Sequence, residues 1–191
     1  RIAATVTGEL LVRNKGRLFI LPGRKGFSNG HKLTLNASYW VFPALESFSR
    51  EFDQPLWDEV IASGKWLVQQ ARFGAYQLPA DWVELENGAV KPSEKYPPRY
   101  SYDAVRIPLH QAWSEAGFTR ADLAPYQRYW SRSKSPPAWI NLNNDTESPF
   151  SWSTGMAAIA ALARHRADDK TGAPRLPRPD KNDGYYSWSL T

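Results

Sequence analysis

The sequence predicts an all-α fold with a minor β-hairpin element. Apolar residues recur at the three- and four-residue spacing of a buried helix face in several segments of the chain. Strand-like segments are few and short, and they flank turn-forming residues. The connections between the helical segments are long, and long loops in a compact domain are more often functional than accidental. At 191 residues, the chain is long enough to form a single domain, residues 1–191, with a sizeable core.

The first third of the chain predicts two short extended segments and two helices. Residues 1–8 are expected to close a helix, and "ELLV" and "RLFILPG" are extended on either side of the turn "RNKG". A helix then begins near Pro43, since proline suits a first helical turn. The next helix is the clearest in the chain, because Asp53 can cap it and apolar residues follow helical spacing for four turns.

A hairpin and one long helix are predicted in the middle of the chain. The segment "WVELENGAV" resembles a hairpin around Asn87-Gly88. A helix is expected to start at Asp103 and end at Gly117, with Pro108 bending or delaying its regular part. Its predicted buried residues are Val105, Leu109, Ala112, Trp113 and Ala116.

Three further helices complete the prediction. The segment 119–133 is a short helix interrupted by Pro125. Ser151 can cap the next helix, and a proline-rich connection leads to a last helix that begins near Asp183. Polar and aromatic residues gather at several of these helix starts. If the helices lie side by side, those ends can meet in one cleft.

Composition excludes several classes of function. Lysine and arginine number 24 against 19 acidic residues, a net charge of +5, but they are scattered, which indicates a solvated surface and no nucleic-acid partner. Cysteine is absent and the histidines His31, His110 and His165 lie far apart, so no metal site and no cofactor are expected. No apolar run approaches the roughly 18 residues that a membrane span needs, and no signal-peptide pattern is present.

The segment "YSYDAVR" places Asp103 and Arg106 three residues apart, so they are neighbours on a helix. An adjacent guanidinium favours the ionised form of a carboxylate, which suits a general base or an electrostatic stabiliser. The alternative interpretation is structural, because aspartate is a favoured helix cap and such pairs are common. Local chemistry leaves both interpretations open.

A set of motifs in order resembles glycoside hydrolase family 8. The motifs are "LPGRKGF", "LNASYW", "PADW", "YDAVR" and "DGYYSWSLT". The sequence most resembles the endo-1,4-β-glucanases encoded alongside bacterial cellulose synthases. The resemblance implies an (α/α)6 barrel around a sugar-binding cleft. It also implies inverting hydrolysis of β-1,4-glucan, in the form of an oligosaccharide or a polysaccharide. An inverting glycosidase uses one carboxylic acid to protonate the glycosidic oxygen and one carboxylate to activate water.

The resemblance also assigns roles to individual residues. The aspartate of the Tyr-Asp-Ala-x-Arg motif is the family's proposed base and matches Asp103, with Arg106 keeping it charged. Tyr39 is implied to help hold the attacking water. Candidates for stacking on glucosyl units or bonding to them are Trp82, Trp40, Tyr102 and Tyr185.

Two small departures and one large one accompany the resemblance. Ala37 replaces a usual proline, and Ala80 is inserted before the aspartate of "PADW". The family's general-acid glutamate, in a Ser-Glu-Gly-like segment, has no match here. Glu46 and Glu51 have no family match and are expected at the surface. We therefore expect this chain to be the C-terminal part of the barrel, with an N-terminal fragment of the same enzyme supplying the acid.

Two alternatives to the glucanase prediction stay open. One is a helical carbohydrate-binding module that uses its tryptophans as platforms without catalysis. The other is the same family acting on chitosan, xylan or mixed-linkage glucan. No cluster of extra acids is present to meet the amino groups of chitosan, which favours a neutral glucan. Family members are secreted or periplasmic, so the resemblance implies that location.

Overall fold

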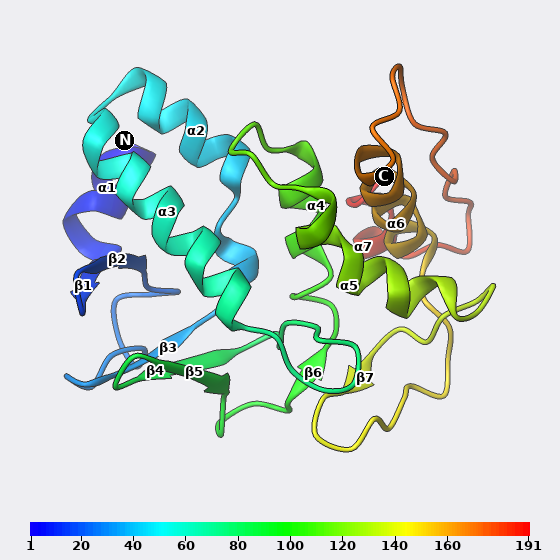
Figure 1. The fold of residues 1–191 in the computed structure, drawn as a ribbon, viewed down its shortest axis with the longest axis horizontal. Coiled ribbons are helices and arrows are strands. Elements are labelled where there is room, and N and C mark those ends of the chain that lie inside the picture. Colours follow the sequence, from blue (N-terminus) through cyan, green and yellow to red (C-terminus); the bar gives the residue numbers. More distant parts are fainter.

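The computed structural model describes residues 1–191, and helices form most of its regular secondary structure, as the sequence predicts. Figure 1 shows the helices on one side of the molecule and strands β3 to β7 along the opposite edge. A single cluster of buried apolar side chains runs through the chain. None of the helices has the length and hydropathy of a membrane-spanning segment. The helices are α1 (Ile2–Thr5), α2 (Phe42–Glu51), α3 (Gln54–Gln70), α4 (Arg106–Trp113), α5 (Arg120–Ser131), α6 (Thr154–Ala167) and α7 (Tyr185–Trp188).

The strands form three small antiparallel sheets, ordered β1-β2, β3-β4-β5 and β6-β7. A π-helical turn at Val6–Leu10 follows α1, and a 3₁₀ turn at Ala37–Tyr39 precedes α2. The strands are β1 (Leu11–Asn14), β2 (Arg17–Ile20), β3 (Lys32–Leu35), β4 (Val83–Glu86), β5 (Ala89–Pro92), β6 (Arg99–Tyr100) and β7 (Ile140–Asn141).

Both predicted hairpins are confirmed. Lys15 and Gly16 join β1 to β2 with φ of 45° and 78°, and Asn87 and Gly88 join β4 to β5 with φ of 53° and 89°. Positive φ at both central residues matches the right-handed twist of the strands in a two-residue hairpin. Strand β3 was not predicted, because its partner β4 is distant in the sequence and the local pattern leads directly into the following helix.

Helices α2 and α3 form where the sequence predicts them. Pro43 lies in the first turn of α2, and Asp53 Oδ1 accepts the backbone N–H of Leu56 at 3.4 Å to cap α3. Gly64 of α3 allows Trp40 to pack directly on the helix, since a Cβ at Gly64 would lie 2.1 Å from Trp40 Cδ1. These contacts place the 3₁₀ turn before α2 firmly against the core.

Four predictions about the later helices need correction. Helix α5 runs continuously through Pro125, because its capping box and the burial of its apolar face outweigh one lost backbone bond. Helix α4 begins at Arg106 and α6 is capped by Ser153, each a few residues later than predicted. Trp113 is 65% exposed and not part of the buried stripe, because α4 ends there and the chain turns away.

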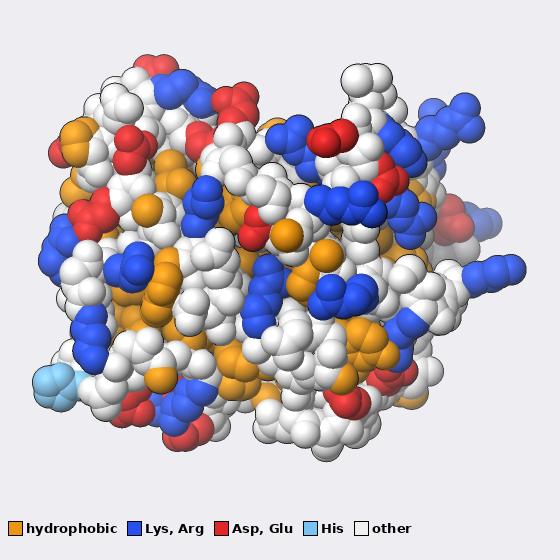
Figure 2. Space-filling model, viewed as in Figure 1, with side chains coloured by type: hydrophobic (Ala, Val, Ile, Leu, Met, Phe, Trp, Pro, Cys, Tyr) orange, Lys and Arg blue, Asp and Glu red, His pale blue; other side chains and the backbone are white.

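Charged side chains are distributed over the surface. On the face shown in Figure 2, basic side chains lie among acidic and neutral ones. Several ion pairs bridge distant segments, for example Arg13 with Glu59 and Arg132 with Glu147. Exposed pairs of this kind contribute little to stability, of the order of 0–1 kcal/mol each.

Candidate active site

A carboxylate and a guanidinium lie together where β6 leads into α4. The chain turns at 101–105, and regular helix begins at Arg106. Val105 occupies the cap position, and no side chain caps the helix. The interpretation of Asp103 as a helix cap is therefore wrong, and its carboxylate is free for other contacts.

A second carboxylate, Asp81, holds the turn that carries Asp103. Its Oδ1 accepts the backbone N–H groups of Ser101 at 3.0 Å and of Ala104 at 2.8 Å. Burial raises the pKa of Asp81 to about 7; the bond from Ala104 opposes this shift, and the charge of Asp103 adds to it. Asp81 thus fixes the backbone on both sides of Asp103.

Arg106 joins Asp103 to the segment that precedes α2. Its Nη2 donates to Asp103 Oδ1 in an ion pair and to Ser38 Oγ at 2.9 Å. Ser38 Oγ in turn donates to Asn36 Oδ1 at 2.7 Å. The Asp103 and Arg106 side chains are 31% and 30% exposed, so the pair reaches solvent while its rear is held by hydrogen bonds.

Tyr39 lies beside this ion pair. The Arg106 guanidinium is 5.9 Å from the centre of its ring, and the residue is partly exposed. Burial raises the pKa of Tyr39, and the negative charge of Asp103 raises it further against the opposing effect of Arg106. Its hydroxyl therefore stays protonated at neutral pH and can both donate and accept a hydrogen bond.

Three aromatic rings continue from Tyr39 along the β3-β4-β5 sheet. The Trp82 ring meets Tyr39 edge-on at 6.0 Å and stacks against Tyr96 at 4.5 Å and Phe27 at 5.9 Å between ring centres. Aromatic rings offer an apolar face with a polar edge. We refer to Tyr39, Trp82, Phe27 and Tyr96 as the aromatic wall.

Two tyrosines lie at the turn that carries Asp103. Tyr102 is partly exposed and meets Tyr186 edge-on at 5.6 Å, and the Tyr186 hydroxyl donates to the Tyr102 carbonyl. Tyr186 thus anchors the C-terminal segment to the turn that presents Asp103. The turn that carries Asp103 thus contacts this tyrosine pair, and the Arg106 partner of Asp103 lies beside Tyr39 of the aromatic wall.

His110 lies one helical turn after Arg106 and is buried. Burial lowers the pKa of His110 to about 4, with the positive charge of Arg106 acting in the same direction. The imidazole is therefore neutral at neutral pH, and Arg106 is the charged group facing Asp103. The site therefore combines the Asp103 carboxylate, the Arg106 guanidinium, a neutral phenol and flanking aromatic rings.

A family model covers almost the whole chain. The model described as "Glycosyl hydrolases family 8" matches residues 2–191. The chain belongs to glycosyl hydrolase family 8. The predicted family membership is confirmed, and the matched span includes every residue of the candidate site.

Curated relatives of the family 8 chain are named as endoglucanases. The endoglucanase of Cellulomonas uda is 36% identical over 165 residues, which are 84% of this chain and 45% of the relative. The probable endoglucanase of Novacetimonas hansenii is 34% identical over 177 residues, which are 90% of this chain and 50% of the relative. The chain thus spans about half the length of the curated relatives it matches.

Solved structures confirm the predicted fold class. The family 8 endoglucanase of Klebsiella pneumoniae superposes with a TM-score of 0.86 at 34% identity, covering 99% of this chain and 59% of that one. The endo-β-1,4-glucanase of Acetobacter xylinum gives 0.88 at 30% identity, with 99% and 59% covered. The family 8 chain forms part of the (α/α)6 fold of these enzymes, since it covers 59% of each of them.

The structure corrects the predicted role of Trp40. Its ring is fully buried, and Nε1 donates to the Val60 carbonyl at 3.2 Å. Trp40 fills the space above Gly64 and cannot stack on a sugar, so that prediction is wrong. A glycine in the middle of the apolar face of α3 was the available signal, but its partner is distant in the sequence.

Other predicted residues differ in their positions. Tyr185 is 89% exposed, and its neighbour Tyr186 makes the contacts to the Asp103 turn. Glu51 is exposed as expected. The expectation that Glu46 lies at the surface is wrong, because it is buried and accepts the Ala116 N–H at 2.8 Å and the Ser114 hydroxyl. That carboxylate ties α2 to the segment after α4.

The structure adds site residues that sequence reasoning missed. Asp81 has no sequence signal beyond its place in the motif "PADW". Ser38 and Asn36 lie in the "LNASYW" motif, but their contact with Arg106 bridges two distant segments. Tyr96 has no sequence signal beyond its type.

Proposed function

We propose that the polypeptide containing these 191 residues is an inverting endo-β-1,4-glucanase and that Asp103 is its general base. The observation that carries the proposal is the solvent-reaching Asp103–Arg106 pair, which has Tyr39 of the aromatic wall beside Arg106 and the Tyr102–Tyr186 pair at the Asp103 turn. An inverting glycosidase requires a carboxylate that activates water, and the position of Asp103 in this family 8 chain supports that role.

The proposed mechanism follows from the contacts around Asp103. The Asp103 carboxylate, which is paired with Arg106, removes a proton from water as the water attacks the anomeric carbon. The neutral Tyr39 hydroxyl helps orient this water. A carboxylic acid from a segment outside these 191 residues protonates the departing glycosidic oxygen on the opposite side of the sugar.

The proposed substrate is a β-1,4-glucan. Two solved relatives at 30–33% identity are named as endo-β-1,4-glucanases. The aromatic wall offers apolar ring faces and hydroxyl groups, and no cluster of acids is required for an uncharged glucan. Because such a polymer is met outside the cytoplasm, we propose a secreted or periplasmic location.

The function is tested by following the anomeric form of the products. The full polypeptide encoded by the gene is incubated with cellohexaose, and proton NMR records the product within the first minutes. Inversion predicts that the α-anomer appears first and that the viscosity of carboxymethylcellulose falls early. An initial β-anomer, or absence of cleavage, contradicts the proposal.

The origin of the acid is tested separately. Residues 1–191 are expressed alone and compared with the full polypeptide in the carboxymethylcellulose assay. We expect the 191-residue chain to be inactive, because no residue of the chain is assigned as the acid. Comparable activity of the two proteins would show that the acid is within these residues and would contradict this part of the proposal.

A further inference from the structure

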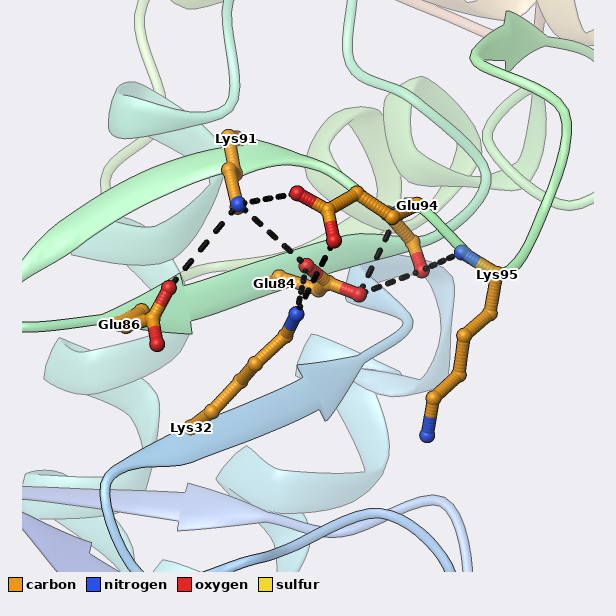
Figure 3. Close-up of polar contacts among 7 residues, drawn as sticks. Lys32, Glu84, Glu86, Lys91, Glu94 and Lys95 are labelled. Carbon is orange, nitrogen blue, oxygen red and sulfur yellow. Dashed lines mark hydrogen bonds and ion pairs between the residues drawn. The ribbon is translucent and has the colours of Figure 1, made fainter.

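A buried carboxylate, Glu84, lies near the aromatic wall, and the mechanism above gives it no role. Glu84 is on β4, the middle strand of its sheet, and its side chain is 0% exposed. A fully buried carboxylate is rare unless it is paired. Figure 3 shows Lys32 of β3 and Lys91 of β5 directed at it from the two neighbouring strands.

The two lysines hold one carboxylate oxygen of Glu84. Lys32 Nζ lies 2.6 Å and Lys91 Nζ lies 3.8 Å from Oε2. Both lysines also approach Glu94: Lys32 Nζ lies 3.6 Å from Glu94 Oε2, and Lys91 Nζ lies 2.6 Å from Glu94 Oε1. Burial raises the pKa of Glu84, but the hydrogen bond from Lys32 and those from Glu94 and Ser93 outweigh it and leave the pKa lowered. Glu84 is therefore ionised at neutral pH.

The other oxygen of Glu84 holds the turn that follows β5. Oε1 accepts the Ser93 hydroxyl at 3.1 Å and the Glu94 N–H at 3.3 Å. Ser93 Oγ in turn accepts the N–H of Lys95 at 3.1 Å. Three consecutive residues are thus fixed to one buried carboxylate, and the residue that follows them is Tyr96.

Glu84 consequently ties together the segments that flank Trp82. Tyr96 stacks on the Trp82 ring with an angle of 21° between the rings, and Phe27 stacks with an angle of 13°. The Phe27 carbonyl accepts the N–H of Thr34 of β3 at 2.8 Å, so this residue is attached to the strand that carries Lys32. The positions of both neighbours of Trp82 therefore depend on segments that Glu84 joins.

Tyr96 forms an accessible end of the aromatic wall. It is 36% exposed, and Trp82 connects it to Tyr39, which lies beside Arg106 and Asp103. An extended glucan bound across Asp103 would therefore pass within reach of this ring. Its exposed face can pack on the C–H groups of a glucosyl unit, and its hydroxyl can bond to sugar hydroxyls.

We propose that Tyr96 is a further substrate-binding residue and that Glu84 is a positioning residue which holds Tyr96 against Trp82. This inference rests on the proposed function, because it places the glucan at the same site. Glu84 does not touch the substrate and acts through the 93–95 turn.

The first test compares kinetic constants of the full polypeptide on cellohexaose. We expect Tyr96→Ala to raise KM roughly threefold to tenfold with kcat nearly unchanged, and Tyr96→Phe to retain most of the binding. Glu84→Gln is close in shape but removes the buried charge that pairs with Lys32 at 2.6 Å, so it should raise KM in the same direction. Glu86→Gln is the matched control, because Glu86 is on the same strand and half-exposed.

The second test is the double variant Glu84→Gln/Tyr96→Ala. If Glu84 acts through Tyr96, the double variant has the KM of Tyr96→Ala alone and not the product of the two effects. If Glu84→Gln does not fold, Ser93→Ala takes its place in the comparison with Tyr96→Ala. This variant removes the hydroxyl that links Glu84 to the turn. Multiplying effects would show that Glu84 acts elsewhere and would overturn its positioning role.

The outcomes separate this inference from the proposed function. An unchanged KM in Tyr96→Ala, with an active wild type, overturns the role of Tyr96 and leaves the glucanase proposal intact. A wild type that does not cleave contradicts the glucanase proposal. In that case titration calorimetry with cellohexaose decides the role of Tyr96. Weaker binding by Tyr96→Ala than by wild type supports that role. Equal binding by the two proteins, or no binding by wild type, overturns it.

Discussion

The carboxylate of Asp81 accepts a hydrogen bond from the backbone N–H of Ala104 at 2.8 Å. This bond and the one from Ser101 fix the turn on which Asp103 reaches solvent. The site therefore contains two carboxylates with different environments: Asp81 is partly buried and accepts backbone N–H groups, and Asp103 is paired with Arg106 and reaches solvent. That division makes separate predictions for the two residues.

Asp81→Asn changes how stability depends on pH. The folded pKa of Asp81, about 7, lies above its ordinary value of 3.8. Its contribution to stability is therefore fully present below pH 3.8 and is lost as the pH rises to about 7. Asparagine keeps the acceptor oxygen but does not titrate. The free energy of unfolding of the variant minus that of wild type should therefore increase by about a few kcal/mol between pH 4 and pH 8.

The Asp81 prediction is measured by urea unfolding at several pH values. Asp145→Asn serves as the control, because Asp145 is exposed and has a positive φ that asparagine also adopts. Parallel stability curves for Asp81→Asn and wild type between pH 4 and pH 8 would contradict the raised pKa of Asp81.

The lowered pKa of His110, about 4, has the opposite effect on stability. The contribution of His110 to the free energy of unfolding is present above pH 6.5 and is lost as the pH falls to about 4.

Substitutions of Arg106 separate charge from geometry. Arg106→Gln removes the charge that pairs with Asp103, and Arg106→Lys keeps a charge but loses the planar group that also reaches Ser38. We expect kcat to fall roughly tenfold or more for glutamine and less for lysine. Because the pair is partly exposed, the free energy of unfolding should change by only about 1 kcal/mol. Equal kcat values for both variants and wild type would exclude a role of the Asp103–Arg106 pair in catalysis.

Gly64→Ala tests the packing of Trp40. The added methyl group would lie 2.1 Å from Cδ1 of the fully buried indole. Overpacking of a core costs about 1–3 kcal/mol and outweighs the helix propensity gained, so the melting temperature should fall. Ala62→Gly is a useful comparison, since it lowers helix propensity on the same helix without a clash. A stabilised Gly64→Ala variant would show that Trp40 is not where the structure places it.

Local patterns predicted the elements that are determined locally. The cap at Asp53, the hairpin turn at Asn87-Gly88 and the buried face of α3 each depend on residues a few positions apart. Strand β3 and the burial of Trp40 were not predicted, because their partners β4 and Gly64 are distant in the sequence. Periodicity carries no information about such contacts.

The candidate site was predictable only in part for the same reason. The motif "YDAVR" brought Asp103 and Arg106 together through helical spacing, and the structure forms that pair. The supporting residues Asp81 and Ser38 come from other segments and contact the pair only once the chain folds. Tyr96 illustrates the limit, since its place in the aromatic wall depends on Glu84 and a turn outside every quoted motif.

The most direct test of the account is the turnover number of Asp103→Asn in the full polypeptide. As general base, Asp103 should contribute roughly 10²- to 10⁴-fold, so kcat on cellohexaose falls by that factor while binding by calorimetry is nearly unchanged. Asp145→Asn should have wild-type kcat, since Asp145 is an exposed carboxylate with no assigned role in the site. A kcat for Asp103→Asn within a few-fold of wild type would contradict the assignment of Asp103 as the base.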